Sequence, residues 1–142
     1  MIVTNRFTNV KIGEFDISRR ANLIGADLSG ADGVDYAIAI TSIIPDCGDL
    51  IGWKKCQDGV IVKLLIAEDT PRSNATGRKC RAKSAQVLEV SGAECGVSQH
   101  DPNTIYRVGE IVECDEWCED RWTECSGGIH FFITRYEAEH YN

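Results

Sequence analysis

The chain lacks the two kinds of apolar segment that direct a protein into or across a membrane. None of its apolar runs approaches the roughly 18 residues of a membrane-spanning helix. Residues 1–6 also lack the apolar centre of a signal peptide. These absences predict a cytoplasmic protein with no membrane partner. The length of 142 residues, 43% of them apolar, is sufficient for a folded core.

The seven cysteines include no close Cys-x-x-Cys pair, which is the spacing of strong zinc motifs. An odd number of cysteines without a secretion signal predicts free thiols or metal ligands rather than a disulfide framework. Cys114, Cys118 and Cys125 come nearest to a set of zinc ligands. Two interpretations stay open. Either there is no cofactor and the thiols are buried or incidental, or zinc stabilises a structural domain.

Basic residues are too few to balance the acids, with 15 Lys and Arg against 22 Asp and Glu and a net charge of −7. This excess of negative charge predicts no direct binding to nucleic acid. The charges are unevenly distributed, since residues 72–83 hold five basic residues and no acid while residues 110–142 hold nine acids. Either the two segments pair in the fold, or Arg78, Lys79 and Arg81 form an anion-binding site.

Apolar side chains recur every five positions near the N-terminus, a period that belongs to neither a helix nor an ordinary strand. The repeat is explicit in ANLIG at residues 21–25, ADLSG at 26–30 and ADG at 31–33. These residues resemble the pentapeptide-repeat family, whose members form a right-handed quadrilateral β-helix. The resemblance implies a short β-helical segment over residues 1–46. The alternative is two or three ordinary strands joined by turns, and residues 36–40 alternate like such a strand.

The pattern changes after a turn cluster at residues 45–49. Strands are predicted at residues 50–55 and 60–66 around Asp58-Gly59, a signal for a type I′ hairpin, and the second of them is apolar enough to be a central strand. Further strands are expected at residues 85–90, 105–112 and 129–133. A capping box of Thr134 and Glu137 then opens a short helix. The predicted fold is mainly β, with the short β-helix followed by a small antiparallel α+β domain over residues 47–142.

Four segments of this second part occur in an order that resembles one known domain. They are GWKKC at residues 52–56, ATGRKCRA at 75–82, YRVG at 106–109 and RWTECSGGIHFF at 121–132. The resemblance is to an uncharacterised domain at the C-terminal end of pentapeptide-repeat proteins from phages and large viruses. It implies a phage or viral origin, with the host cytoplasm as the location of the protein.

A second resemblance concerns an enzyme. Tyr106-x-x-Gly109, followed by the strand of His130 and by Thr134, resembles the core of ADP-ribosyltransferases, in which such residues line an NAD cleft. The resemblance implies a nucleotide-binding role for Tyr106, His130 and Thr134. Two departures count against it. Trp53-Lys54 stands where that family has an anchoring Arg or His, and no strand is expected after the last helix. His130 is otherwise predicted to be a core histidine that donates to a backbone carbonyl.

The acidic segment after residue 114 favours a third function, which is docking onto a basic surface of another protein. We expect the partner-binding residues to be the carboxylates and the tryptophans of this segment: Asp115, Glu116, Trp117, Glu119, Asp120 and Trp122. The function predicted from the sequence is therefore a non-enzymatic, phage-encoded binding protein. Its partner would be a host nucleic-acid-handling or defence protein with a basic surface. A homodimer formed through the N-terminal β-helical end is a further expectation.

Overall fold

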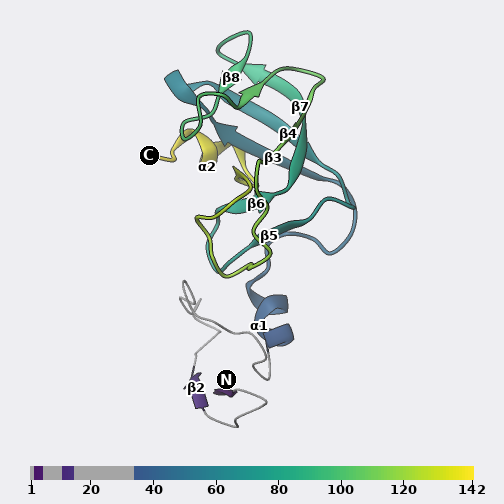
Figure 1. Cartoon of the computed structure of the whole chain (residues 1–142), viewed down its shortest axis with the longest axis vertical. Coiled ribbons are helices and arrows are strands. Elements are labelled where there is room, and N and C mark those ends of the chain that lie inside the picture. Colours follow the sequence, from purple (N-terminus) through teal and green to yellow (C-terminus); the bar gives the residue numbers. More distant parts are fainter. Residues whose placement is uncertain (1, 5–10, 15–33) are drawn as a thin grey trace.

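The structure is a computed structural model, and it describes residues 2–4, 11–14 and 34–142 of the chain. Within these residues the main element is a four-stranded sheet in which every neighbouring pair is antiparallel. In spatial order its strands are β10 (Ile111–Glu113), β7 (Ser84–Ser91), β4 (Ile61–Ile66) and β3 (Leu50–Lys55). Strand β4 lies between β3 and β7, as Figure 1 shows, so the predicted central strand is confirmed.

The turn between β3 and β4 has the geometry that the Asp58-Gly59 pair predicts. Asp58 has φ 56° and Gly59 has φ 75°, and the amide of Val60 donates to the carbonyl of Gln57 over 3.2 Å. A type I′ turn requires positive φ at both of its central residues. Asn or Asp at the first position and Gly at the second adopt this conformation at little cost. The local sequence therefore sets the register of the hairpin.

A second, three-stranded sheet adjoins the first. Its strands, in spatial order, are β11 (Ile129–Phe131), β6 (Cys80–Ala82) and β5 (Arg72–Asn74). A pair of 2.8 Å backbone hydrogen bonds between Trp53 and Phe132 connects this sheet to β3. Side chains of both sheets form one buried core: Val62, Leu64, Ile66, Cys80, Ala82, Val87, Ile129 and Phe131. Among the described strands, β5 and β10 stay at the edges, so the sheets do not close into a barrel.

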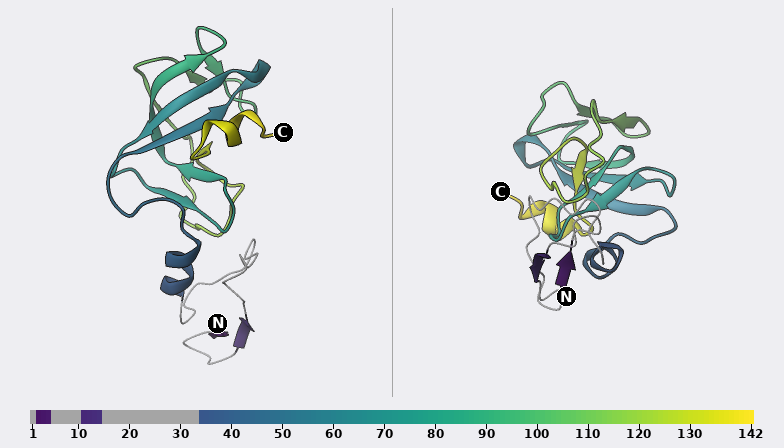
Figure 2. Two further views of the ribbon diagram at one scale, coloured as in Figure 1. Left: turned by 180° about the vertical axis from the view of Figure 1, so that it is seen from behind. Right: turned by 60° about the horizontal axis from the view of Figure 1, so that its bottom comes forward.

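The smaller elements complete the body. Strands β8 (Gly96–Val97) and β9 (Ile105–Tyr106) form a separate hairpin, and Figure 2 shows the C-terminal helix α2 (Arg135–Glu139), which packs against β3. Thr134 accepts a hydrogen bond from the Glu137 amide while the Glu137 carboxylate accepts one from the Thr134 amide. The predicted capping box is therefore confirmed. None of the helices in the described residues has the length and apolarity required to cross a membrane.

Helix α1 (Val34–Thr41) precedes this body and projects from the end where β5 lies (Figure 1). The buried Asn74 side chain binds the end of this helix, accepting from the Ile43 amide at 3.0 Å and donating to the Thr41 carbonyl at 2.9 Å. Arg72 donates to the carbonyls of Pro45 and Gly48. The segment between α1 and β3 is thus hydrogen-bonded to β5 at both of its ends.

The prediction of a β-helix followed by an α+β domain is wrong. Strands β1 (Ile2–Thr4) and β2 (Lys11–Glu14) pair antiparallel, whereas successive coils of a β-helix place their strands parallel. Residues 36–40, which alternate like a strand, belong to helix α1. The described part from residue 34 is a small antiparallel β-sheet domain with few helices. The explicit repeats at residues 21–33 lie outside the described residues.

One buried side chain attaches the long loop of residues 115–128 to the second sheet. Arg81 of β6 is only 2% exposed, and its guanidinium donates to the carbonyls of Cys118 (3.2 Å), Gly127 (2.7 Å) and Asp120 (2.8 Å). The same guanidinium lies 5.0 Å from the centre of the Trp117 ring. A planar guanidinium with five donors can satisfy three carbonyls and stack on an aromatic ring at once.

Arg81→Met should lower the free energy of unfolding by at least about 3 kcal/mol, because three carbonyl groups lose a charged donor together. Urea unfolding with a common m-value measures this change. The matched control is Arg107→Met at an exposed arginine, where we expect a change below about 0.5 kcal/mol. A loss in Arg81→Met no larger than in this control would show that Arg81 does not hold the loop.

Candidate functional site

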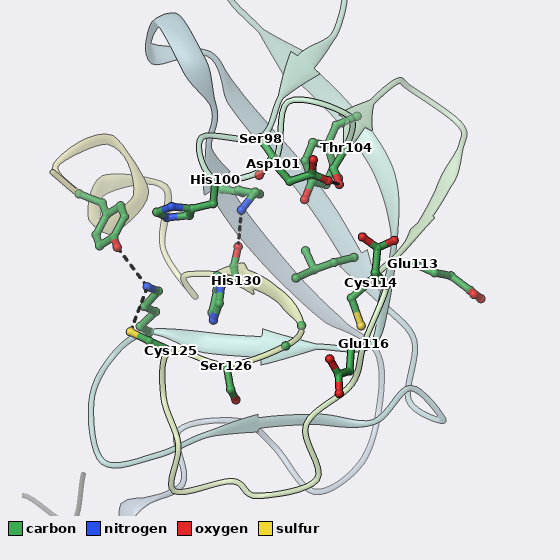
Figure 3. A pocket seen from close by; sticks show the side chains of 18 residues that line it. Ser98, His100, Asp101, Thr104, Glu113, Cys114, Glu116, Cys125, Ser126 and His130 are labelled. Carbon is green, nitrogen blue, oxygen red and sulfur yellow. Dashed lines mark hydrogen bonds between the residues drawn. The ribbon is translucent and has the colours of Figure 1, made fainter. Parts of the chain in front are cut away.

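The described residues enclose a cavity of about 530 Å³, which lies within the size range of small-molecule sites. It lies where strands β3, β9 and β11 meet the loops that follow β8, β10 and residue 124. Figure 3 shows Cys125 and His130 on one side of the cavity and Glu113, Cys114 and Glu116 on another. Segments that are far apart in the sequence therefore supply the walls.

One end of the cavity is basic. Lys54 of β3 is only 8% exposed, and its ammonium donates to the His130 carbonyl over 3.2 Å. Burial lowers the pKa of Lys54, an effect that Cys56 opposes and the nearby charge of Lys79 reinforces. The ammonium of Lys79 donates to the Tyr141 hydroxyl at 3.1 Å and contacts the Cys125 sulfur at 3.7 Å. Two amines therefore reach the same end of the cavity from different strands.

His130 lines the same end of the cavity and is uncharged at neutral pH. Burial, followed by repulsion from Lys79 and Lys54, lowers the pKa of its ring to about 4. Its Nε2 lies 3.2 Å from the Glu124 carbonyl oxygen, which can only accept, so Nε2 carries the proton of the neutral ring. This geometry agrees with the expected donation to a backbone carbonyl, but His130 lines the cavity instead of lying in the core.

Glu113 and Glu116 lie across the cavity from Cys125 and His130, and with Asp115 they form an acidic rim, while Asp101 lies apart from them beside Ser98 and Thr104 (Figure 3). Hydrogen bonds from the Thr104 hydroxyl and then from the Asn103 amide lower the pKa of Asp101. The side chains of Glu113, Asp115 and Glu116 are exposed. The ion pairs among the described residues join Arg78 to Glu137 and Arg135 to Glu139, so no described side chain neutralises the rim.

The structure divides the predicted partner-binding segment into exposed and buried residues. Asp115 and Glu116 lie at the cavity rim, and Glu119 is exposed. The Asp120 carboxylate accepts from the Trp122 amide and the Thr123 hydroxyl, which closes a local turn. Trp122 is 5% exposed, with the Arg121 guanidinium 5.4 Å from its ring, and Trp117 stacks on Arg81. Both tryptophans pack inside the loop that carries the carboxylates.

The three basic residues predicted as one anion site separate in the fold. Arg78 pairs with Glu137 over 2.5 Å, and Arg81 is enclosed by backbone carbonyls. Only Lys79 lines the cavity. The basic and acidic segments thus pair in part, through Arg78 and Glu137. This is one of the two arrangements that the sequence predicted. Of the three residues predicted for the anion site, only Lys79 remains a candidate.

The candidate zinc ligands also separate. Cys114 and Cys125 line the cavity, whereas the Cys118 thiol contacts the Asp120 carbonyl at 3.9 Å. Within residues 2–4, 11–14 and 34–142, no three Cys, His, Asp or Glu side chains come together to hold a metal ion. All seven cysteines are free thiols in this structure, and Cys56 and Cys80 are buried. The zinc interpretation stays a prediction without support from these residues.

Two of the three candidate nucleotide-binding residues share the cavity. Tyr106, which is 2% exposed, and His130 line it, and burial raises the pKa of the Tyr106 hydroxyl. Thr134 does not line it, because its side chain caps helix α2.

Lys54 is the functional candidate that sequence reasoning missed. It follows Leu50 and Gly52 at the alternate, inward-facing positions of β3, so strand periodicity could have identified a lysine on the core side.

The fold and this site define a small antiparallel β domain with a ligand-sized cavity whose two ends carry opposite charge. A protein-family model, described as a family of unknown function (DUF5758), matches residues 40–138. The chain therefore belongs to this family. No curated protein and no solved structure matches the chain.

The low pKa of His130 predicts that the protein loses stability as the pH falls from about 6.5 to about 4. In that window the unfolded chain binds a proton that the folded chain does not, so protonation favours unfolding. His130→Gln cannot take up this proton, and the fall in its free energy of unfolding should be smaller. Urea unfolding at several pH values measures both slopes.

His140→Gln is the control for this experiment, because it removes an exposed histidine outside the cavity. We expect it to retain the slope of the unmodified protein. Identical slopes for His130→Gln and the unmodified protein would contradict the buried, neutral state of His130.

Proposed function

We propose that this domain is a non-enzymatic protein-binding module that docks onto a basic surface of its partner. The observation that carries the proposal is the acidic rim of the cavity, in which Glu113, Asp115 and Glu116 are exposed and have no ion-pair partner among the described residues. Carboxylates that are clustered and not neutralised attract a partner of opposite charge and orient its approach.

The backbone that carries these carboxylates is held in place, which favours binding. The Cys114 amide donates to the Lys83 carbonyl at 2.9 Å, and the Arg81 guanidinium binds the Cys118 carbonyl. Gly127 lets this backbone pass closely, because a Cβ there would collide with the Glu116 carbonyl. A rim ordered before binding loses little conformational entropy when a partner arrives. The tryptophans contribute by fixing the loop.

The partner identity that we propose rests on the sequence. Residues 21–33 resemble pentapeptide repeats, and the order of motifs over residues 52–132 resembles proteins of phages and large viruses. On that basis we propose a phage or viral protein acting in the host cytoplasm on a host protein with a basic surface. The NAD-binding alternative has Tyr106 and His130 in one cavity but lacks Thr134, so only part of its residue set meets there.

Replacing Glu113, Asp115 and Glu116 together by Lys should weaken the binding of a labelled oligo-arginine peptide by about tenfold or more, since each rim charge contributes up to about 1 kcal/mol. Fluorescence anisotropy at low and at physiological salt measures the affinity. The affinity of the unmodified protein should fall as salt rises, because salt screens exposed charges.

The matched control reverses three exposed acids that do not line the cavity, Glu68, Asp69 and Glu94, and produces the same change in net charge. We expect this variant to lose much less affinity than the rim variant. Equal losses would mean that net charge alone attracts the peptide, and the proposed rim would be wrong.

A further inference from the structure

The basic end of the cavity has more hydrogen-bond donors than acceptors. The Lys54 ammonium has three N–H donors, and in the described part of the chain only the His130 carbonyl accepts from it. The residue is only 8% exposed, and its ammonium meets solvent through the cavity that it lines. A buried ammonium is costly unless an anion or further acceptors compensate for its lost hydration. Apart from the Tyr106 ring, whose centre lies 5.7 Å from the ammonium, no described group interacts with its two remaining donors.

The charges around Lys54 increase this imbalance. Lys79 and His130 line the same end, and no described carboxylate pairs with either lysine. Lys54 and Lys79 lower the pKa of His130, and Lys79 lowers the pKa of Lys54. Both effects are repulsions between like charges, and no described carboxylate forms an ion pair with the two lysines to offset them. A bound anion would remove the repulsion and supply the missing acceptors.

There is space for such a group. A second, smaller cavity adjoins the first, and both are lined by Lys54, Lys79, His100, His130 and Tyr141. The two lysines therefore lie where the cavities meet, and the larger one is also lined by Ile129 and by Tyr106, whose ring centre is 5.7 Å from the Lys54 ammonium. A ligand could place a charged group between the amines and its less polar part against these side chains.

We propose that the inner end of the cavity is an anion site in which Lys54 and Lys79 hold a carboxylate or phosphate group of a small ligand. The site uses different residues from the acidic rim, so it is independent of the proposed docking of a basic partner. The carboxylates of the rim repel a polyanion such as a nucleic acid. The ligand is thus a small molecule with one anionic group and a neutral or cationic remainder.

The test uses two probes, sodium phosphate and sodium acetate, each titrated to millimolar concentration into the full chain at constant sodium and pH 7. Amide and histidine signals in NMR spectra report binding. We expect saturable shifts at His130 and its neighbours in β11. Binding of phosphate alone would indicate a phosphorylated ligand, binding of acetate alone a carboxylate ligand, and binding of both would support the common anion site.

Lys79→Met and Lys54→Met should each weaken this binding by about tenfold or more, because each removes one charge-assisted contact. Lys83→Met removes an exposed lysine outside the cavity and serves as the control, with unchanged binding expected. Lys79 is partly exposed, so the Lys79→Met variant should fold. It therefore tests the anion site even if the variant at the buried position, Lys54→Met, does not fold.

A second readout separates binding from a purely structural role of the lysines. The pKa of His130, held near 4 by burial and by the two lysines, should rise in saturating phosphate because the anion offsets their charges. The groups that act on the ring are Lys54 of β3, Lys79 beside β6 and Arg81 of β6.

The proposal is overturned if neither anion shifts these signals, or if the shifts are unchanged in both Lys→Met variants. Either result leaves the peptide assay on the acidic rim unaffected. The two ideas can therefore fail separately.

Discussion

The binding of Arg81 to three backbone carbonyls is the interaction on which the rest of this domain depends. It attaches the loop of residues 115–128, which has no regular secondary structure, to a strand of the second sheet. The same loop carries Asp115 and Glu116 at the cavity rim and leads directly into β11. A loop without its own strand pairing requires such a partner for its carbonyls, because unpaired polar groups are costly when they leave water. Arg81, which is itself inaccessible to solvent, thus holds the rim in position.

The cavity separates charge within a short distance. Lys54 and Lys79 occupy its inner end, and carboxylates that follow β10 occupy its rim. The two sets do not form ion pairs among the described residues, although the chain has acids in excess. An ion pair between a lysine of the inner end and a rim carboxylate would be favourable, but none forms. Lys54 is nevertheless buried, which costs free energy. Such an arrangement is characteristic of sites that interact with a ligand, since groups placed only for stability would be paired.

Sequence reasoning identified several members of the cavity without predicting that they meet. His130 and Tyr106 came from one motif, Lys79 from a basic segment and Cys114 from a cysteine pattern, and each was assigned to a different function. The same reasoning could not separate Lys79 from its neighbours Arg78 and Arg81, which pair with Glu137 and with backbone carbonyls. Arg78 and Lys79 lie in the loop before β6 and only Arg81 lies on the strand, so neighbours in the sequence have different surroundings in the fold.

The sequence by itself determined the features that depend on near neighbours. The type I′ turn at Asp58-Gly59, the capping box at Thr134 and the central strand β4 follow from the conformational preferences and spacing of a few consecutive residues. The tertiary structure decided which side chains share the cavity, because the contact between Lys54 and His130 joins positions 76 residues apart. Local preferences carry no information about such pairs. Their proximity results from the packing of two sheets around one core, which brings distant segments of the chain to the same cavity.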